Sequence, residues 1–296
     1  MSFALIDAKK AEVPIEMACA VLNVSVSGYY AWKRRPASQR QTDDMVLLAH
    51  IRAEFSTSNG TYGSPRMHAE LTESGLAIGR NRVARLMSEN GLKARQKTRF
   101  KKTTDSDHAG PVAPNVLNQD FTTDGPDEKW GVDISYVWTA EGWLYLAIVL
   151  DLYSRKIVGW SMSDRMKRGL AMDALRRAII LRQPPPGLIH HSDRGSQYCS
   201  DDYRRLVRDY GFVASMSGRG NCFDNAMVET VFKTIKSELI WRTAFTTREQ
   251  AAKAIGQYIE GFYNPRRRHS SHGYISPAAF EAQHRTRNRE EQIALH

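Results

Sequence analysis

The spacing of hydrophobic positions changes at about residue 130 of this 296-residue chain. Before that point, apolar residues recur at intervals of three and four, as in Leu47, Leu48, Ile51 and Phe55. This spacing is typical of amphipathic helices with one buried face. The front third is therefore predicted to be helical, with two short helices within residues 14–34 and further helices at 43–55, 64–74 and 78–90.

After residue 130 the pattern alternates between strands and helices. Residues 143–150 form an uninterrupted apolar run, typical of a central strand buried on both faces. The predicted order is three strands, which could form an antiparallel meander, then helix, strand, helix, strand and helix, so an α/β domain is expected. The strands are predicted at 131–137, 143–150, 156–160, 188–191 and 212–214, and the helices at 167–182, from about 200, and at 224–240.

The apolar run at residues 143–150 is far shorter than a membrane span. It has eight residues, whereas a membrane helix needs about 18 or more. The N-terminal segment also carries acids and lysines where a signal peptide needs an apolar stretch. We therefore expect no membrane partner and a cytoplasmic protein.

The charge balance points to a polyanionic partner. Lys and Arg number 42 and Asp and Glu number 32, a net charge of +10, and most of the excess lies in residues 1–105. Such a basic region favours nucleic acid as the partner. Residues 14–34 have the pattern of a helix-turn-helix or of an ordinary pair of antiparallel helices, and spacing alone leaves both open. The three cysteines, without a CxxC pair, disfavour a disulfide framework or a thiolate zinc site.

Three carboxylates in the α/β region have the placement that metal-dependent phosphodiester chemistry needs. Asp133 lies in the first predicted strand, Asp193 just past the fourth, and Glu229 in the first turns of the last long helix. Acids from two neighbouring strands and a nearby helix can converge at one edge of a sheet. Mg²⁺ prefers hard oxygen ligands, and a pair of such ions can activate the attacking oxygen and stabilise the leaving oxygen.

Together with several short motifs, these acids carry a resemblance that extends over nearly the whole chain. The sequence resembles OrfB-type transposases of the insertion-sequence-three family, which have an integrase catalytic core of the Asp-Asp-Glu superfamily. The matching stretches are residues 27–32, 62–66, 130–136, 151–160, 191–198, 215–217, 224–229, 236–238, 263–264, 268–270 and 276–277.

The resemblance implies the fold class and the domain organisation. We expect an α/β, RNase H-like integrase core, with a five-stranded mixed sheet and flanking helices, preceded by a small all-α helix-turn-helix-like region. The expected parts are a helix-turn-helix-like segment (1–36), a helical DNA-binding domain (37–92), a basic linker (93–125), the integrase core with its C-terminal helix (126–285) and a tail (286–296).

The resemblance also implies the activity. Asp133, Asp193 and Glu229 would be the catalytic triad and would bind two Mg²⁺ ions, which Mn²⁺ can replace. The enzyme would cut and join DNA at the terminal inverted repeats of a mobile element and insert it into target DNA. It would work as a homo-oligomer near the nucleoid, with the product of an upstream reading frame as fusion or partner. Two alternatives remain: an RNase H-like nuclease or resolvase, and an inactive DNA-binding remnant of a transposase.

Six polar side chains are predicted DNA contacts. Lys236 follows Glu229 by seven residues, which places it two turns further along the same helix face, and the family has a basic residue there. Lys233 lies one turn after Glu229. Arg194 and Gln197 follow Asp193, and Arg268 and His269 belong to a basic cluster near the C-terminus. For the lysines and the cluster, the alternative is an ordinary solvated surface charge.

Several other titratable groups are predicted to be structural. We expect Asp151 to cap the turn that follows its strand, and Asp224 to be the N-cap of the last long helix. Glu238 is nine residues after Glu229, on the opposite side of that helix, and is expected to be structural or on the surface. His190 and His191 are interpreted as packing at a strand end or as neighbours of a phosphate, because Mg²⁺ prefers oxygen ligands.

Overall fold

The computed structural model describes residues 2–94, 112–218 and 224–294. Most of the predicted basic linker therefore lies outside the described residues, and so does Cys222. The chain divides into two compact units, Met1–Ala53 and Glu54–His296. Each unit is considered by itself.

The first unit is helical. It contains α1 (Ser2–Lys9), α2 (Ile15–Val21), α3 (Val26–Arg34) and the greater part of α4 (Gln39–Thr57). Ile6, Cys19 and Tyr29 form its core, which explains why α2 and α3 pack with α1, a helix that the sequence pattern did not reveal. The break before α3 is closed by Ser25, whose side-chain oxygen accepts a hydrogen bond from the Gly28 amide at 3.0 Å.

The second unit begins with two amphipathic helices, α5 (Ser64–Glu73) and α6 (Arg80–Glu89). Their residues Met67, Val83, Leu86 and Met87 are buried. The chain leaves the two helices at Gly75 and Gly91, both in the left-handed region of the backbone.

Five strands form one mixed sheet: β1 (Lys129–Thr139), β2 (Gly142–Asp151), β3 (Ile157–Ser163), β4 (Ile189–Ser192) and β5 (Val213–Met216). Their order is β3-β2-β1-β4-β5. The first three strands make the predicted antiparallel meander, while β4 is parallel to β1 and β5 is parallel to β4.

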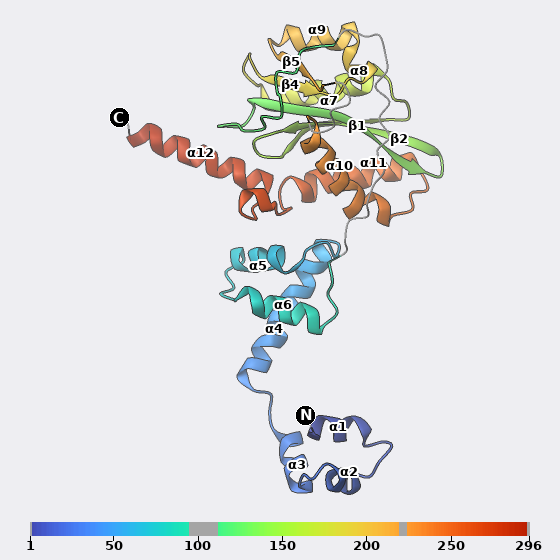
Figure 1. Ribbon diagram of the computed structural model, residues 1–296, viewed down its shortest axis with the longest axis vertical. Coiled ribbons are helices and arrows are strands. Elements are labelled where there is room, and N and C mark those ends of the chain that lie inside the picture. Colours follow the sequence, from blue (N-terminus) through green and yellow to red (C-terminus); the bar gives the residue numbers. More distant parts are fainter. Residues whose placement is uncertain (1, 95–111, 219–223, 295–296) are drawn as a thin grey trace. The chain divides into compact units, whose positions relative to one another are not determined.

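Helices cover both faces of the sheet (Figure 1). On one face lie α10 (Ala226–Glu238) and α11 (Arg248–Tyr258), and on the other lie α7 (Arg168–Arg182), α8 (Ser196–Cys199) and α9 (Asp201–Asp209). The apolar run in β2 is explained by these two layers, because Leu146 and Ile148 belong to the core with α10 and α11 while Ala147 and Val149 belong to the core with α7. The predicted five-stranded α/β fold with flanking helices is confirmed.

The chain ends in shorter elements and one long helix. The 3₁₀ turn η1 (Ile240–Arg242) follows α10, and the π-helical turn η2 (Ile259–Tyr263) continues α11. The 3₁₀ turn η3 (Ser270–His272) then leads to α12 (Pro277–Ala294). Among the described residues, no helix has both the length and the apolar character to cross a membrane.

Candidate active site

Asp133 on β1 and Asp193 just past the end of β4 follow paired positions on adjacent parallel strands. In the register of β1 and β4, Val132 is opposite Ser192, so the residue after each of these two is an aspartate. Neighbouring strands are about 4.8 Å apart. Within the described residues β4 ends at Ser192, so one edge of β1 lacks a strand neighbour from Asp133 onward.

The first turn of α10 carries Glu229 to the same place. The Asn225 side chain, at the N-cap of α10, donates a hydrogen bond to the Val132 carbonyl at 3.3 Å. A β-carbon on Gly131 would lie only 2.6 Å from Cγ2 of Val228, so the absence of a side chain on Gly131 allows the helix to approach the strand. Glu229 follows Val228 directly and therefore starts from the helix turn packed on β1.

The electrostatics of Asp133 show that the three carboxylates act on one another. Burial raises the pKa of Asp133 well above its ordinary value, and the negative charges of Asp193 and Glu229 raise it further. The Ile134 amide, which donates to Oδ1 at 2.7 Å, and the positive charge of Lys236 lower the pKa without reversing the shift. The site thus carries an excess of negative charge that a cation would relieve.

The three carboxylates are suitable ligands for a hard divalent cation, although their oxygens do not converge on a single point. Carboxylate oxygens are the ligands that Mg²⁺ prefers, usually together with water and substrate phosphate. In the parts of the chain that the structure describes, no three His, Cys, Asp or Glu side chains are close enough to hold an ion together. The fit therefore rests on the type of donor and on the uncompensated charge.

Backbone and lysine contacts hold the other two acids. Oδ1 of Asp193 accepts a hydrogen bond from the Gly195 amide at 2.9 Å. A β-carbon on Gly195 would also lie 2.9 Å from that oxygen, so a larger residue there would push the Asp193 carboxylate aside. Lys233 Nζ lies 3.5 Å from Oε2 of Glu229, and its side chain is half exposed.

Lys236 lies at the edge of the site. Its side chain is buried, and Nζ lies 4.8 Å from the centroid of the Tyr136 ring. Burial lowers the pKa of Lys236, while the negative charge of Asp133 acts in the opposite direction. The lysine is therefore close enough to Asp133 for each charge to influence the other.

The two predicted contacts that follow Asp193 have partners within the protein. Arg194 Nε donates to the Ser217 carbonyl at 2.8 Å. Gln197 is partly exposed, and its amide nitrogen lies 3.5 Å from the Met166 carbonyl. Arg194 directly follows Asp193 in the loop, and Gln197 lies in α8, the short helix that follows it.

Arg268 and His269 lie inside the protein. The Arg268 guanidinium is buried and donates to Glu70 at 2.7 Å, to Glu73, and to the Tyr274 carbonyl at 3.1 Å. Burial and the nearby charge of Arg267 lower the pKa of His269 to about 2, so its ring is neutral. These environments do not favour the predicted phosphate contacts, and no local pattern in the sequence points to partners almost 200 residues away.

The competing acids have the following roles. The prediction for Asp151 is confirmed, because its Oδ1 accepts hydrogen bonds from the amide and the hydroxyl of Ser154, both at 2.8 Å. The prediction for Asp224 as an N-cap is wrong. Asn225 is the N-cap, and Asp224 instead accepts hydrogen bonds from the Asn115 side chain at 3.0 Å and the Gly218 amide at 2.8 Å. Its position before the helix suited both roles, and only the fold brings Asn115 to it.

His190 and His191 pack at the strand end, as predicted. The Tyr203 hydroxyl lies 2.9 Å from Nε2 of His190, and Ser215 and Ser217 lie 2.9 and 3.2 Å from the ring nitrogens of His191. Burial lowers the pKa of each histidine to about 4. Both are therefore neutral near pH 7.

The sequence did not reveal Tyr198 as a neighbour of the candidate active site. Its hydroxyl is buried, and within the described residues it has no hydrogen-bond partner. Burial raises its pKa well above the ordinary value, and the charges of Asp133 and Asp193 contribute to this rise. Its only sequence signal was its position in the motif that contains Asp193.

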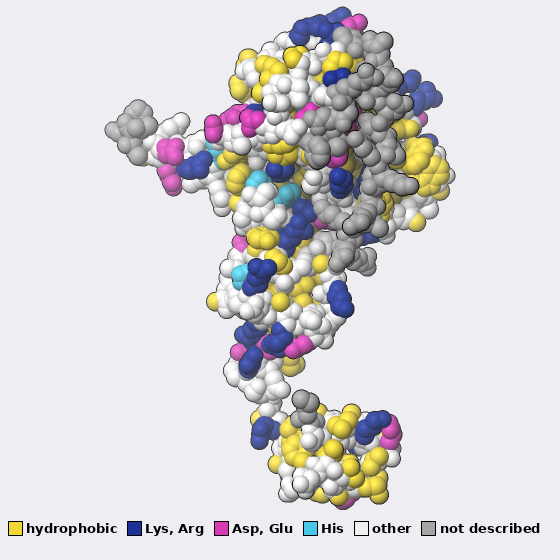
Figure 2. All heavy atoms as spheres, viewed as in Figure 1, with side chains coloured by type: hydrophobic (Ala, Val, Ile, Leu, Met, Phe, Trp, Pro, Cys, Tyr) yellow, Lys and Arg dark blue, Asp and Glu magenta, His cyan; other side chains and the backbone are white. Residues whose placement is uncertain are grey.

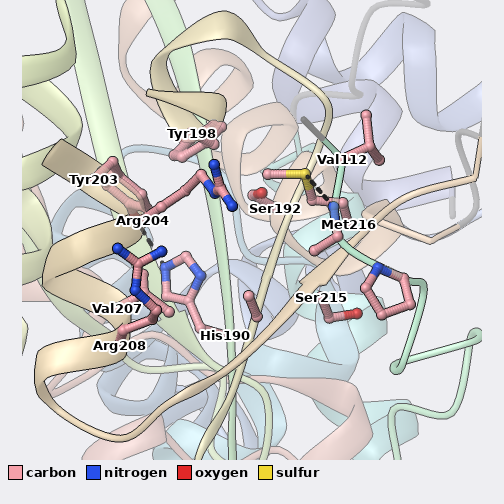
Figure 3. A pocket seen from close by; sticks show the side chains of 13 residues that line it. Val112, His190, Ser192, Tyr198, Tyr203, Arg204, Val207, Arg208, Ser215 and Met216 are labelled. Carbon is pink, nitrogen blue, oxygen red and sulfur yellow. Dashed lines mark hydrogen bonds between the residues drawn. The ribbon is translucent and has the colours of Figure 1, made fainter. Parts of the chain in front are cut away.

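A cavity of about 330 Å³ lies next to β4 and β5 (Figure 3). It is lined by residues of β4, β5, α8, α9 and the segment 112–114; Arg204 and Arg208 contribute the charged side chains, and Tyr198 is the residue of α8. None of the three acids lines it.

Family models match most of the chain. Two family models described as integrase core domain match residues 123–222 and 210–277, and one described as HTH-like domain matches residues 42–100. The HTH-like match thus covers α4 from residue 42 through α6 and continues past the expected end of the DNA-binding domain at residue 92, whereas residues 1–36 lie outside it.

Two relatives cover almost the whole chain. The "Insertion element IS600 uncharacterized 31 kDa protein" of Shigella sonnei is 47% identical over 262 residues, which are 88% of this chain and 96% of that protein. The transposase InsF for insertion sequence IS3A of Escherichia coli (strain K12) is 42% identical over 283 residues, which are 95% and 98% of the two chains.

Solved structures show a more distant likeness. The simian T-cell lymphotropic virus intasome in complex with PP2A regulatory subunit B56 gamma has a TM-score of 0.44 at 13% identity, over 72% of this chain and 69% of that chain. The HTLV-2 integrase catalytic core domain in complex with magnesium, trimeric form, has a TM-score of 0.43 at 15% identity, over 54% and 99%. From the family models and the full-length relatives, we conclude that the chain belongs to the IS3 family of transposases and has an integrase catalytic core.

Proposed function

We propose that this transposase cuts and joins DNA at the ends of an insertion sequence, with Asp133, Asp193 and Glu229 holding two Mg²⁺ ions. The observation that supports the proposal is that the three acids come from neighbouring segments. Val132 of β1 pairs with Ser192 of β4, and the start of α10 packs closely on Gly131 of β1. The raised pKa of Asp133 supports it, because a cluster of carboxylates needs a cation to remain ionised.

The reaction consists of two phosphoryl transfers. Water attacks the phosphorus at the element's end, and the bond to the 3′ oxygen breaks as the new P–O bond forms, which frees a 3′-hydroxyl. That hydroxyl then attacks a second phosphodiester, where one P–O bond again forms as another breaks. Bound divalent cations would supply activation of the attacking oxygen and stabilisation of the leaving oxygen; Mn²⁺ is expected to replace Mg²⁺.

The remaining residues would bind and orient DNA. Lys236 and Lys233 would contact the strand that enters the acid site, and Arg194 and Gln197 would contact it from the loop after Asp193 and from α8. The helices matched by the HTH-like family model would hold the terminal inverted repeats. Because two ends must meet, the working form would be a homo-oligomer on nucleoid DNA, with the upstream frame's product as a fusion or partner.

The decisive experiment compares Asp193→Asn with a matched control. Purified variants are incubated with Mg²⁺ and duplexes that contain the element's ends, and cleavage and joined products are measured separately. Asp193→Asn is expected to abolish both while retaining DNA binding, and Asp201→Asn, an exposed acid on α9, should behave like the wild type. Unchanged Mg²⁺-dependent cleavage by Asp193→Asn would refute the site assignment.

Pre-cut ends distinguish the proposal from its alternatives. A transposase joins such ends to target DNA, whereas an RNase H-like nuclease or a resolvase gives no joined product from them. A DNA-binding remnant would bind the ends and neither cut nor join them.

A further inference from the structure

Three large aromatic side chains lie exposed at the end of the β1–β2 hairpin. Trp138 and Trp143 are opposite each other in the register, and the ring centroids of Trp138 and Tyr136 lie 4.8 and 5.0 Å from that of Trp143. Trp138 is 59% exposed, Trp143 42% and Tyr136 37%. Figure 2 shows hydrophobic side chains gathered on the surface where Figure 1 has the end of this hairpin. We call these three residues the aromatic platform.

Within the part of the chain that the structure describes, the platform is exposed. The core beneath α7 and α9 includes Ile134 and Tyr145 at its margin, and the platform residues lie further along the same two strands. Exposed clusters of large apolar side chains commonly mark sites of interaction. The rings meet edge to face, with interplanar angles of 72° and 82°. They are therefore not stacked face to face on one another.

The platform is linked to Asp133 through Lys236. Tyr136 is three residues from Asp133 on β1, about 10 Å at about 3.4 Å per residue, and this odd separation places the two side chains on opposite faces of the sheet. Lys236, which influences Asp133, lies over the Tyr136 ring at 4.8 Å. The Lys236 side chain meets the Tyr136 ring at the edge of β1. Among the described residues, this edge has no strand neighbour beyond Val132. Positive charge therefore lies between the acids and the exposed rings.

We propose that unpaired nucleobases next to the reacting phosphodiester stack on Tyr136, Trp138 and Trp143, while Lys236 contacts the backbone of the same strand. The occupant is thus single-stranded DNA. Aromatic rings bind bases of any sequence through their faces, and adjacent basic groups follow the phosphates. A purely apolar protein partner would not account for the lysine placed between the rings and the acids. The inference rests on the proposed function, because it gives the platform the strand that is cut and joined.

The test measures binding rather than chemistry. The full chain carrying Asp193→Asn, so that no cleavage intervenes, is titrated in EDTA with two fluorescent probes of the same sequence. One probe is fully paired, and the other ends in three unpaired nucleotides. We expect the second to bind about tenfold more tightly, the scale of stacking one or two bases.

Three substitutions separate stacking from general hydrophobic contact. Trp138→Leu retains apolar area without an aromatic face and is expected to abolish the preference for the unpaired end while leaving binding of the paired probe unchanged. Trp138→Phe should retain most of the preference. Tyr210→Leu removes an exposed aromatic side chain elsewhere and should have no effect.

Each result has a clear meaning. A preference that survives Trp138→Leu, or that is absent before substitution, overturns the inference. A change in oligomeric state in Trp138→Leu, measured by light scattering, also overturns it and assigns the platform to contact between copies of the chain. Because binding is measured without metal, failure here is distinguishable from failure of the acid assignment, which is judged by cleavage.

Discussion

Glu229 and Glu238 lie on the same helix, α10, yet their surroundings are opposite in charge. Glu229 is one of the three acids of the candidate active site, with Asp133 and Asp193, and its negative charge contributes to the raised pKa of Asp133. Glu238 is buried and accepts hydrogen bonds from Arg267 at 2.6 and 2.8 Å and from the Tyr258 hydroxyl at 2.6 Å. Burial alone would raise the pKa of Glu238, but Arg267 outweighs it and holds the pKa below its ordinary value.

The difference shows that one helix can carry acids in two opposite electrostatic environments. At its first turn, Glu229 adds negative charge that acts on Asp133. At its last turn, opposite charges form a closed cluster, to which Arg66 of α5 also contributes with a nitrogen 3.9 Å from Glu238. This cluster joins the helical and α/β parts of the second unit, whereas the proposed metal site lies at the other end of the helix.

The largest expected effect comes from exchanging the two glutamates for glutamine in turn. Glu229→Gln is expected to lower the rate of DNA cleavage by about ten thousandfold, or about 5 kcal/mol of activation free energy, because a neutral amide is a poor ligand for a divalent cation. Its melting temperature should stay close to that of the wild type. Glu238→Gln should instead lower the melting temperature, because Arg267 would lose its buried counter-ion.

Single-turnover cleavage and thermal unfolding by circular dichroism measure these two outcomes. The contrast between the two glutamates would be refuted if Glu229→Gln destabilised the fold as much as Glu238→Gln, because both acids would then be structural.

A smaller effect is expected when the closed cluster is broken from its other side. Arg267→Met leaves Glu238 buried without its charged partner, which typically costs about 3–5 kcal/mol of unfolding free energy. The double variant Glu238→Gln with Arg267→Met should recover part of that loss, because no unpaired charge remains. Urea unfolding of the three variants measures this, and a double variant less stable than either single one would contradict the interpretation.

The smallest effect is a dependence on pH. Because the pKa of Glu238 is lowered in the folded state, the stability that its charge supplies is present above the ordinary pKa of 4.5 and is lost as the pH falls through the folded-state value. The gap in melting temperature between the wild type and Glu238→Gln should therefore be widest near about pH 7 and narrow towards about pH 3. A gap that widens on acidification would show that the charge of Glu238 is not stabilising.

Local pattern predicted the elements well where one physical rule dominates. The two-sided apolar run identified β2, and the glycines after α5 and α6 marked their ends. It failed for α1, whose short sequence has almost no periodic amphipathic pattern and which is held by burial of Ile6 with Cys19 and Tyr29. Arg268 likewise has the local sequence of a surface cation, and only its distant partners Glu70 and Glu73 explain its burial.

By itself, the sequence determined the α/β order of elements, the basic front third and the three acids at positions typical of metal-dependent DNA chemistry. These features are local, because periodicity, charge and motif spacing are read within a short stretch of chain. Only the tertiary structure decided that β1 and β4 are neighbours with Val132 opposite Ser192, that Glu238 is paired with Arg267, and that Tyr136, Trp138 and Trp143 are exposed among the described residues. Those outcomes depend on contacts between residues far apart in the chain, where register, burial and charge pairing are set by packing.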